Sequence, residues 1–332
     1  MLKLIHKTKE GSQYCGDSLK LIKSKRFRDK YKGKINLIIT SPPFDLTLKK
    51  EYGNLNGQQY IDWLSSFAEP LSDLLTTDGS IVIELGNSFD QGSPTFSTIP
   101  MEALLSFKKA GNLYLCQEFI CHNPARLPSP AEWVTVRRIR LKDSYTRLWW
   151  FSKTPNPKAD NKKVLREYSS AMLEKFEKRN MSEGKRPSGH VITKSFNKNN
   201  GGSIQSNYFQ ADRDKFLFEG QSSMSFSNAD NQKNYHQFCL NHNLPRHPAK
   251  MQKKLIETII RFMTDPGDVV FDPFSGSNTT GSVAESLERK WISCDMDISY
   301  ILGSLIRFYD EDKCRNIIER MAKSGIQKME RK

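Results

Sequence analysis

The sequence predicts an α/β fold with a mainly parallel, doubly wound sheet and a smaller, irregular second region. Three observations support this: a β-branched apolar run over 35–40, a strand–helix–strand pattern over 35–86, and a similar pattern over 268–295. Strands joined by a helix through short turns run parallel, and a parallel sheet is covered by helices on both faces. A chain of 332 residues is long enough for a large core and a second, smaller domain.

The first elements are a short segment at 13–19, a basic amphipathic stretch, and a buried strand at 35–40. Asp17 either faces a ligand or caps the helix that follows it. Pro42 and Pro43 end the strand, since neither can donate to a ladder and each keeps the preceding residue extended. Ser41, the proline carbonyls and the ring of Phe44 then lie at the strand's carboxyl end, where open α/β sheets bind ligands. Such a rim suits a flat ring that carries an amino group, although an ordinary strand followed by a proline turn has the same sequence.

The elements after this turn continue the strand–helix alternation. Apolar residues at helical spacing predict a helix over 58–76, which Asp78 and Gly79 end. A buried strand over 80–86, a helix over 99–110 and a strand over 113–121 follow. Residues 149–151 (Trp-Trp-Phe) are interpreted as part of a last strand in the core.

The composition indicates a polyanionic partner. Lys and Arg number 51 against 37 Asp and Glu, a net charge of +14, and such an excess attracts polyanions. No apolar run reaches the length of a membrane span, and the amino terminus lacks the apolar core of a signal peptide. Six scattered cysteines show no metal-site spacing and are typical of reduced thiols in the cytoplasm.

Two basic regions are candidates for nucleic-acid contact. The stretch 123–153 interleaves cations with aromatic residues, a pattern suited to neutralising phosphates, and we expect phosphate contacts from Arg137, Arg138, Arg140 and Lys142. Residues 154–240 lose clear periodicity, apart from one helix predicted over 163–180, but keep too many aromatics for a disordered insert. Base and phosphate contacts are expected there from Arg186, His190, Lys194, Asn200, Gly201, Gly202 and Ser203, and from Lys49 and Lys50 after the first strand.

The last hundred residues contain a second ligand-binding pattern. A helix from 247 to 263 is followed by a strand (268–272), a small-residue turn (273–281), a helix (282–287) and a strand ending at Asp295. An acid about 20 residues after such a turn accepts hydrogen bonds from ribose hydroxyls. The turn lacks the glycine pattern of a dinucleotide site and the lysine of a P-loop, and Asp272 at its start disfavours phosphate. S-adenosylmethionine, with a ribose, an ammonium and a sulfonium, fits these residues.

These motifs resemble those of a known family. Residues 272–277 are similar to the cofactor motif of amino-group DNA methyltransferases, and residues 40–44 to their catalytic motif. Catalytic motif first and cofactor motif last is the order of the circularly permuted beta group, and Ser-Pro-Pro-Phe is typical of its cytosine-N4-specific members in type II restriction–modification systems. The likeness continues at 49–54, 127–130, 149–153, 186–190, 200–204 and 277–281. Asp295 departs from the commoner glutamate, and Met251 from an aromatic residue.

The resemblance implies a Rossmann-like, S-adenosylmethionine-dependent methyltransferase. Its catalytic part is 1–153, its target-recognition region 154–240 and its cofactor-binding part 241–332. Ser41, Pro42, Pro43 and Phe44 are the implied catalytic residues. Cofactor contacts are implied for Asp17, Lys254, Asp272, Pro273, Phe274, Gly276, Ser277, Asn278, Thr279 and Asp295.

The implied substrate is a short sequence of double-stranded DNA, methylated on cytosine N4 in the cytoplasm to protect it from a partner restriction endonuclease. The enzyme would be a monomer or a dimer. Three alternatives stay open: adenine-N6 methylation on the same scaffold, a non-catalytic DNA-binding subunit, and an RNA or protein methyltransferase.

Overall fold

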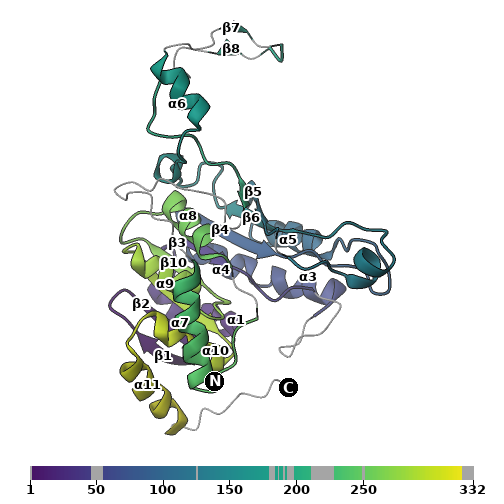
Figure 1. Cartoon of the computed structure of the whole chain (residues 1–332). Coiled ribbons are helices and arrows are strands. Elements are labelled where there is room, and N and C mark those ends of the chain that lie inside the picture. The colour runs from purple at the N-terminus through teal and green to yellow at the C-terminus, as the bar shows by residue number, and fades with distance from the viewer. Residues whose placement is uncertain are drawn as a thin grey trace. The chain divides into compact units, whose positions relative to one another are not determined.

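The computed structural model describes residues 2–45, 55–124, 126–178, 184–185, 187–189, 191–192, 198–210, 228–248 and 251–323. The chain forms two compact units (Figure 1). The larger unit comprises Met1–Ala159, Asn207–Ala211 and Ser227–Lys332, and the smaller unit comprises Asp160–Ser206 and Asp212–Phe226. No helix in the described part of the chain is long and apolar enough to cross a membrane.

The larger unit is built on a sheet whose strand order, within the described residues, is β1-β2-β11-β10-β3-β4-β6-β5-β9. The neighbours β2, β11, β10, β3 and β4 run parallel, whereas β1 is antiparallel to β2 and β6 is antiparallel to both β4 and β5. This confirms the predicted mainly parallel α/β sheet. The strands are β1 (Lys3–Lys7), β2 (Gly11–Cys15), β3 (Ile35–Thr40), β4 (Leu75–Leu85), β5 (Tyr114–His122), β6 (Tyr145–Ser152), β9 (Tyr208–Gln210), β10 (Val269–Asp272) and β11 (Lys290–Asp295).

Helices pack on this sheet and connect its strands (Figure 1). Those of the larger unit are α1 (Ser18–Lys23), α2 (Lys25–Tyr31), α3 (Gly57–Ser65), α4 (Ala68–Leu74), α5 (Ile99–Ala110), α7 (Asn228–Asn241), α8 (Lys253–Met263), α9 (Thr279–Ser286), α10 (Ile298–Ser304) and α11 (Glu311–Lys323), with short helical turns at Glu132–Val136 and Leu305–Arg307. The smaller unit contains a turn at Asn161–Val164, α6 (Ser170–Glu177), and the hairpin β7 (Gly184–Lys185) and β8 (Val191–Ile192).

The strand predictions hold because the apolar runs are buried. Leu37, Ile38 and Ile39 of β3 have no solvent exposure, so both faces of this strand lie in the core. Trp149 and Phe151 of β6 belong to the same core cluster, which confirms the interpretation of 149–151 as a core strand. A second cluster joins Ile5 and Cys15 to α10 and α11.

Several helix boundaries differ from the prediction. The helix predicted over 58–76 is two helices, because the chain turns at Ser66 and Phe67, and β4 then starts at Leu75, which pairs with Ile35. The helix predicted from 247 starts at Lys253 instead. In the smaller unit the helix predicted over 163–180 is limited to Ser170–Glu177, where the Ser169 side chain accepts the amide of Met172 as an N-cap.

The division into units also differs from the predicted recognition region, 154–240. The smaller unit begins at Asp160, and both β9 and α7 belong to the larger unit. Helix α7 belongs there because its aromatic side chains Tyr235 and Phe238 are buried in that unit. Part of the sequence that looks irregular therefore completes the core.

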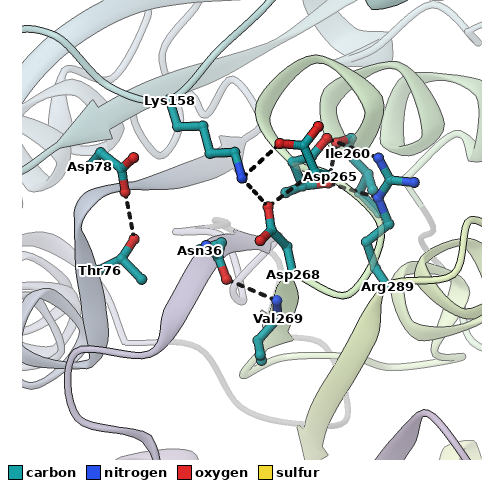
Figure 2. A network of polar contacts seen from close by, with 10 residues as sticks. Asn36, Thr76, Asp78, Lys158, Ile260, Asp265, Asp268, Val269 and Arg289 are labelled. Carbon is teal, nitrogen blue, oxygen red and sulfur yellow. Dashed lines mark hydrogen bonds and ion pairs between the residues drawn. The ribbon is translucent and has the colours of Figure 1, made fainter.

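A polar network joins the amino-terminal ends of the central strands (Figure 2). The Lys158 ammonium lies 2.9 Å from Asp265 and 2.7 Å from Asp268, in the turn before β10. The Lys158 amide also donates to the Asp78 carbonyl in β4, and the Val269 amide donates to the Asn36 side chain in β3. Burial alone would lower the pKa of Lys158, but its bonds to the two carboxylates outweigh burial and raise it. The network holds the two halves of the sheet together at the edge opposite the candidate site.

Candidate active site

The candidate site lies at the carboxyl ends of β3 and β10, which are parallel neighbours. From β3 the sheet continues to β4 on one side, and from β10 it continues to β11 on the other. Connections that diverge in this way create the crevice in which open α/β sheets bind ligands. Thr40 Oγ1, at the end of β3, donates a 2.7 Å hydrogen bond to Asp272 Oδ1, at the end of β10. The two predicted motifs thus meet in one place.

Ser41 has a partner that sequence reasoning missed. Thr40 pairs with Ile83, so the next residues, Ser41 and Glu84, lie side by side and their side chains are hydrogen-bonded. Glu84 is only 9% exposed and also accepts a 2.8 Å hydrogen bond from Thr146 Oγ1 in β6. A single acid within the apolar strand 80–86 was the signal that could have identified it, because buried acids are rare without a partner.

The environment of Glu84 sets the orientation of Ser41. Burial raises the pKa of Glu84, while the hydrogen bonds from Thr146 and Ser41 and the charge of Arg126 oppose that rise. When the Ser41 hydroxyl donates a hydrogen bond to Glu84, the lone pairs of its oxygen are available to accept a hydrogen bond from a ligand. The pair therefore makes Ser41 an acceptor and provides a carboxylate that can take up a proton.

Phe44 is held by close packing against a glycine. A Cβ atom at Gly86 would lie 2.6 Å from the Phe44 ring, so only glycine at this position leaves room for the ring. Pro42 is buried, and Pro43 and Phe44 are half-buried. The next two residues after Gly86, Asn87 and Ser88, are buried too, and neither Asn87 Nδ2 nor Ser88 Oγ has a hydrogen-bond partner within the described ranges. Buried polar atoms of this kind usually have a hydrogen-bond partner, and a polar ligand at the carboxyl ends of the strands would supply one.

Asp272 organises the loop between β10 and α9. Its Oδ1 accepts hydrogen bonds from Thr40 and from the Phe274 amide (3.1 Å), and its Oδ2 accepts one from Thr280 (2.8 Å). Burial raises the pKa of Asp272 to about 6, against the effect of these donors. Most of its acceptor capacity is used inside the protein, so its main role in the structure is to fix the loop.

The loop itself allows close approach of backbone. Gly276 has φ +48°, and a Cβ atom there would lie 2.6 Å from the His247 ring. Asn278 also has a left-handed conformation, φ +50°, and its Oδ1 accepts the Gly281 amide at 3.1 Å as the N-cap of α9. Asn278 Nδ2 is buried and has no hydrogen-bond partner in the part of the chain that the structure describes.

Asp295 lies beside the loop at the end of β11. Its Oδ2 accepts the Gly276 amide at 2.7 Å and its Oδ1 accepts the Asp297 amide at 2.8 Å. Each carboxylate oxygen has two lone pairs and can accept more than one hydrogen bond. The half-exposed Asp295 is thus placed to accept hydrogen bonds from a diol that lies over residues 273–281, the glycine loop.

Asp17 lies at the same edge of the sheet. The Gly16 amide donates to the Asp295 carbonyl at 2.9 Å, which places the turn after β2 next to the end of β11. Asp17 Oδ1 accepts the amides of Leu19 (2.8 Å) and Lys20 (3.2 Å). This confirms that Asp17 caps α1, and its half-buried position beside Asp295 is compatible with the ligand role as well.

The other predicted cofactor residues line or support the same loop. The Pro273 carbonyl accepts a hydrogen bond from Ser18 Oγ, and the Phe274 ring packs on those of Trp63 and Phe67. The Ser277 carbonyl accepts Arg307 Nε at 2.8 Å, and the Ser277 hydroxyl lies 3.4 Å from that of Thr279, the first residue of α9. Lys254 is the second residue of α8, whose last residue precedes the amino end of β10, so α8 begins near the carboxyl ends of the strands.

The structure separates the predicted phosphate contacts into two kinds. Arg137 and Arg138 are exposed, with Arg137 lying over the Trp133 ring. Arg140 instead contacts the Pro94 carbonyl, Asp143 and the Phe89 ring. Lys142 donates to the carbonyls of Pro124 (2.9 Å) and Arg126 (3.3 Å). The latter two cations hold their own loop in place, which sequence reasoning did not anticipate.

In the smaller unit, the loop 199–203, which contains the predicted contacts from Asn200 to Ser203, is anchored through its backbone. Ser203 and Arg166 exchange two backbone hydrogen bonds, and the Asn200 amide donates to the Tyr168 hydroxyl. Gly201 has φ +85°, and Gly202 lies so close to Arg166 that a Cβ atom would be 2.7 Å from its carbonyl oxygen. The predicted DNA contacts Lys49, Lys50, Arg186, His190 and Lys194 lie outside the described residues.

Comparisons with known proteins identify the family of the chain. Residues 35–305 match the family described as DNA methylase. Over 320 residues the chain is 42% identical to the type II methyltransferase M.PvuII of Proteus hauseri, covering 95% of this chain and 89% of that protein.

Two solved structures extend the comparison to the fold. PvuII DNA methyltransferase, named as cytosine-N4-specific, has a TM-score of 0.70 at 35% identity and covers 97% of this chain and 95% of its own. A DNA modification methylase of Thermus thermophilus, solved in complex with S-adenosyl-L-methionine, has a TM-score of 0.50 at 15% identity, covers 92% and 93%, and shares the fold. The chain whose Ser-Pro-Pro-Phe turn and glycine loop meet at Thr40 and Asp272 therefore belongs to the DNA methylase family.

Proposed function

We propose that the protein transfers a methyl group from S-adenosylmethionine to the N4 amino group of cytosine in a short sequence of double-stranded DNA. The observation that carries this proposal is the Thr40–Asp272 hydrogen bond, which holds the Ser-Pro-Pro-Phe turn against the glycine loop. A methyl donor on the loop and an amine on the turn would then be neighbours. The likeness to M.PvuII along 95% of the chain supports the same activity.

The residues around the glycine loop fit S-adenosylmethionine. Asp295 offers two oxygens to a ribose diol, and Gly276 lets the backbone approach the ligand. The buried Asn278 Nδ2, unpaired within the described residues, is suited to a ligand oxygen. Asp17 and Lys254 lie at the same edge, and Pro273, Phe274, Ser277 and Thr279 complete the loop. When bound, the cofactor supplies an electrophilic methyl group on a sulfonium.

The turn after β3 is suited to hold the amine of cytosine. This amine is a poor nucleophile because its lone pair is delocalised into the ring. We infer that Ser41 Oγ and the Pro42 carbonyl accept hydrogen bonds from its two N–H groups, which draws the nitrogen toward tetrahedral geometry and aims its lone pair at the methyl group. Phe44, held by Gly86, would stack on the base. Positioning and electrostatics then supply most of the rate.

Glu84 gives the released proton a destination. As the N4–methyl bond forms, one N4 proton passes to Ser41 Oγ while Ser41 passes its own proton to Glu84, to which it is hydrogen-bonded. The raised pKa of the buried Glu84 makes it a better proton acceptor than an exposed carboxylate. Ser41 thus keeps its starting protonation state, and Glu84 regains its own once it releases the proton to solvent.

The DNA has to present its base outside the helix, because the amine of a paired cytosine cannot reach the base of a sheet crevice. The exposed Arg137 and Arg138 are proposed to contact phosphates, and the smaller unit, with its loop 199–203, is proposed as the main target-recognition element. In the chain the catalytic motif comes first, the recognition region second and the cofactor motif last. This order would make the protein a beta-group enzyme. It would act in the cytoplasm, as a monomer or a dimer, and protect DNA from a restriction endonuclease.

Nucleoside mass spectrometry tests the activity. Plasmid DNA incubated with the protein and S-adenosylmethionine is hydrolysed, and we expect N4-methylcytosine from the wild type and none from Ser41→Ala. N6-methyladenine as the sole product would contradict the proposed target, and no methylated base on any DNA tested would contradict the activity. Sequencing that detects N4-methylcytosine then gives the recognition sequence.

A further inference from the structure

The connection between β5 and β6, residues 123–144, rises from the edge of the sheet that carries the candidate site. His122 at the end of β5 pairs with Tyr145 at the start of β6, and Arg147 pairs with Leu85 at the end of β4. Thr146, two residues after the connection, donates to Glu84. The connection therefore borders the place where Ser41 and Glu84 meet.

This connection exposes apolar side chains that have no role in the core. Leu141 is 91% exposed, more than any other large apolar side chain that the structure describes. Leu127, Val136 and Ile139 of the same connection are exposed as well. Exposed apolar side chains gathered in one segment mark a surface that becomes covered by a partner.

The neighbours of Leu141 fix the backbone on both sides of it. Arg140 contacts the Pro94 carbonyl, the Asp143 carboxylate and the Phe89 ring. Lys142 donates to the carbonyls of Pro124 and Arg126 across the connection. Both cationic side chains thus turn back onto the protein, and Leu141 between them is left in solvent on an anchored segment. A flexible surface loop would not keep Leu141 in a fixed, exposed position.

Charge complementarity indicates which partner covers it. The exposed Arg137 and Arg138 lie on the same connection, and the protein carries a net charge of +14. Cations beside an exposed apolar side chain are the combination by which proteins hold a phosphate backbone and insert a wedge between bases. A hydrophobic protein partner would instead leave the arginines facing an apolar surface.

We propose that Leu141 is a wedge that enters the DNA duplex and fills the space left by the extruded cytosine. This inference rests on the proposed function, since it requires a base that leaves the helix and enters the site beside Ser41. An apolar side chain in the vacated space keeps the stack from closing and so favours the extruded state. Leu141 touches no reacting atom and acts through the position of the base.

Substrates that differ in the cost of extrusion test the wedge. Single-turnover methylation is measured on a duplex that carries the site mapped for the wild type, once with cytosine paired to guanine and once with cytosine opposite an abasic position. Leu141→Ala is expected to slow methylation of the paired duplex roughly tenfold or more, because unstacking and unpairing are costly steps that the wedge assists. On the unpaired duplex it should match the wild type, since little extrusion is left to assist.

Two controls accompany this comparison. Leu105→Ala removes a leucine that is 54% exposed on α5 and should leave both rates unchanged. Leu141→Met keeps apolar bulk and should keep most of the rate. An equal loss on both duplexes, or no loss on either, would overturn the wedge. A wild type that methylates neither duplex would instead contradict the proposed function.

Discussion

Thr40 Oγ1 and Asp272 Oδ1, separated by 232 positions in the sequence, are joined by a 2.7 Å hydrogen bond at the carboxyl edge of the sheet. Thr40 directly precedes the Ser-Pro-Pro-Phe turn, and Asp272 directly precedes the glycine loop. One buried bond therefore sets the distance between the residues proposed to hold the base and those proposed to hold the methyl donor. The Phe274 amide and the Thr280 hydroxyl donate further hydrogen bonds to the same Asp272 carboxylate.

Thr40→Val is expected to weaken both the fold and cofactor binding. The substitution keeps the shape of the side chain but leaves Asp272 with one donor fewer, and losing a partner of a buried polar group costs about 1–3 kcal/mol. Urea denaturation gives the change in the free energy of unfolding, and calorimetry gives the affinity for S-adenosylmethionine. Thr40→Ser keeps the hydroxyl and is the matched control. Wild-type values for both quantities in Thr40→Val would show that the bond does not position the loop.

Asp272 should make the stability depend on pH. Burial raises its pKa from 3.8 to about 6 in the folded protein, so between these values the native state holds a proton that the unfolded chain has released. The free energy of unfolding therefore falls as the pH rises through this window, by about 3 kcal/mol, and levels off above it. Urea titrations at about pH 3.5, 5 and 7, which span this window, give the slope of stability against pH for the wild type and for Asp272→Asn. The same slope in both proteins would remove Asp272 as its source.

Glu84→Gln is expected to reduce kcat and to abolish its acid limb. Burial raises the pKa of Glu84, so in the wild type kcat should fall on acidification as Glu84 takes up a proton and can no longer accept one from Ser41. Glutamine can accept the Ser41 hydrogen bond but not a proton, which predicts a rate lower by roughly 10²-fold with no acid limb. The pH profile of single-turnover methylation checks this. Unchanged cofactor affinity serves as the control, and a wild-type profile in Glu84→Gln would exclude the proton-acceptor role.

Asp295→Ala should weaken S-adenosylmethionine binding more than it lowers the methylation rate at saturating cofactor. The substitution removes the acceptors for a ribose diol and also frees the amides of Gly276 and Asp297. Asp295→Asn retains one acceptor oxygen and should lose less affinity. Calorimetry on the three proteins gives the ranking: we expect a loss of roughly tenfold or more for alanine, the value of a charge-assisted hydrogen bond. Equal affinities would remove Asp295 from the ribose site.

Lys158→Met should destabilise the fold without changing the chemistry. It leaves Asp265 and Asp268 close together and without their shared cation at the amino edge of the sheet (Figure 2). Because Lys158 is partly exposed, we expect a modest loss, about 1 kcal/mol, in the free energy of unfolding. Arg28→Met breaks the exposed pair with Asp73 and is the matched control, with a smaller effect. Equal losses in the two variants would show that the network is no stronger than a surface ion pair.

Local patterns were sufficient for the parts of the fold that depend on neighbouring residues. The apolar runs at Ile35–Thr40, Val269–Asp272 and Lys290–Asp295 form strands as predicted, because burial on both faces follows from composition alone. The small-residue turn after Asp272 likewise follows from residue type, since Gly276 has a positive φ. Helix ends were less predictable: Ser66 and Phe67 interrupt a helix that the apolar spacing continues.

The sequence by itself therefore determined the class of fold, the strand that ends at the Ser-Pro-Pro-Phe turn, the small-residue loop after Asp272 and the strand that ends at Asp295. Only the tertiary structure placed Glu84 beside Ser41, turned the carboxylate of Asp272 inward, and assigned Arg140 and Lys142 to bracing the segment that carries Leu141. The reason is physical: composition and period decide whether a segment is a buried strand, but which strands are neighbours, and in what register, depends on packing across the whole sheet. That register decides which side chain on another strand is the partner of a given residue, and the residue type alone does not indicate this partner.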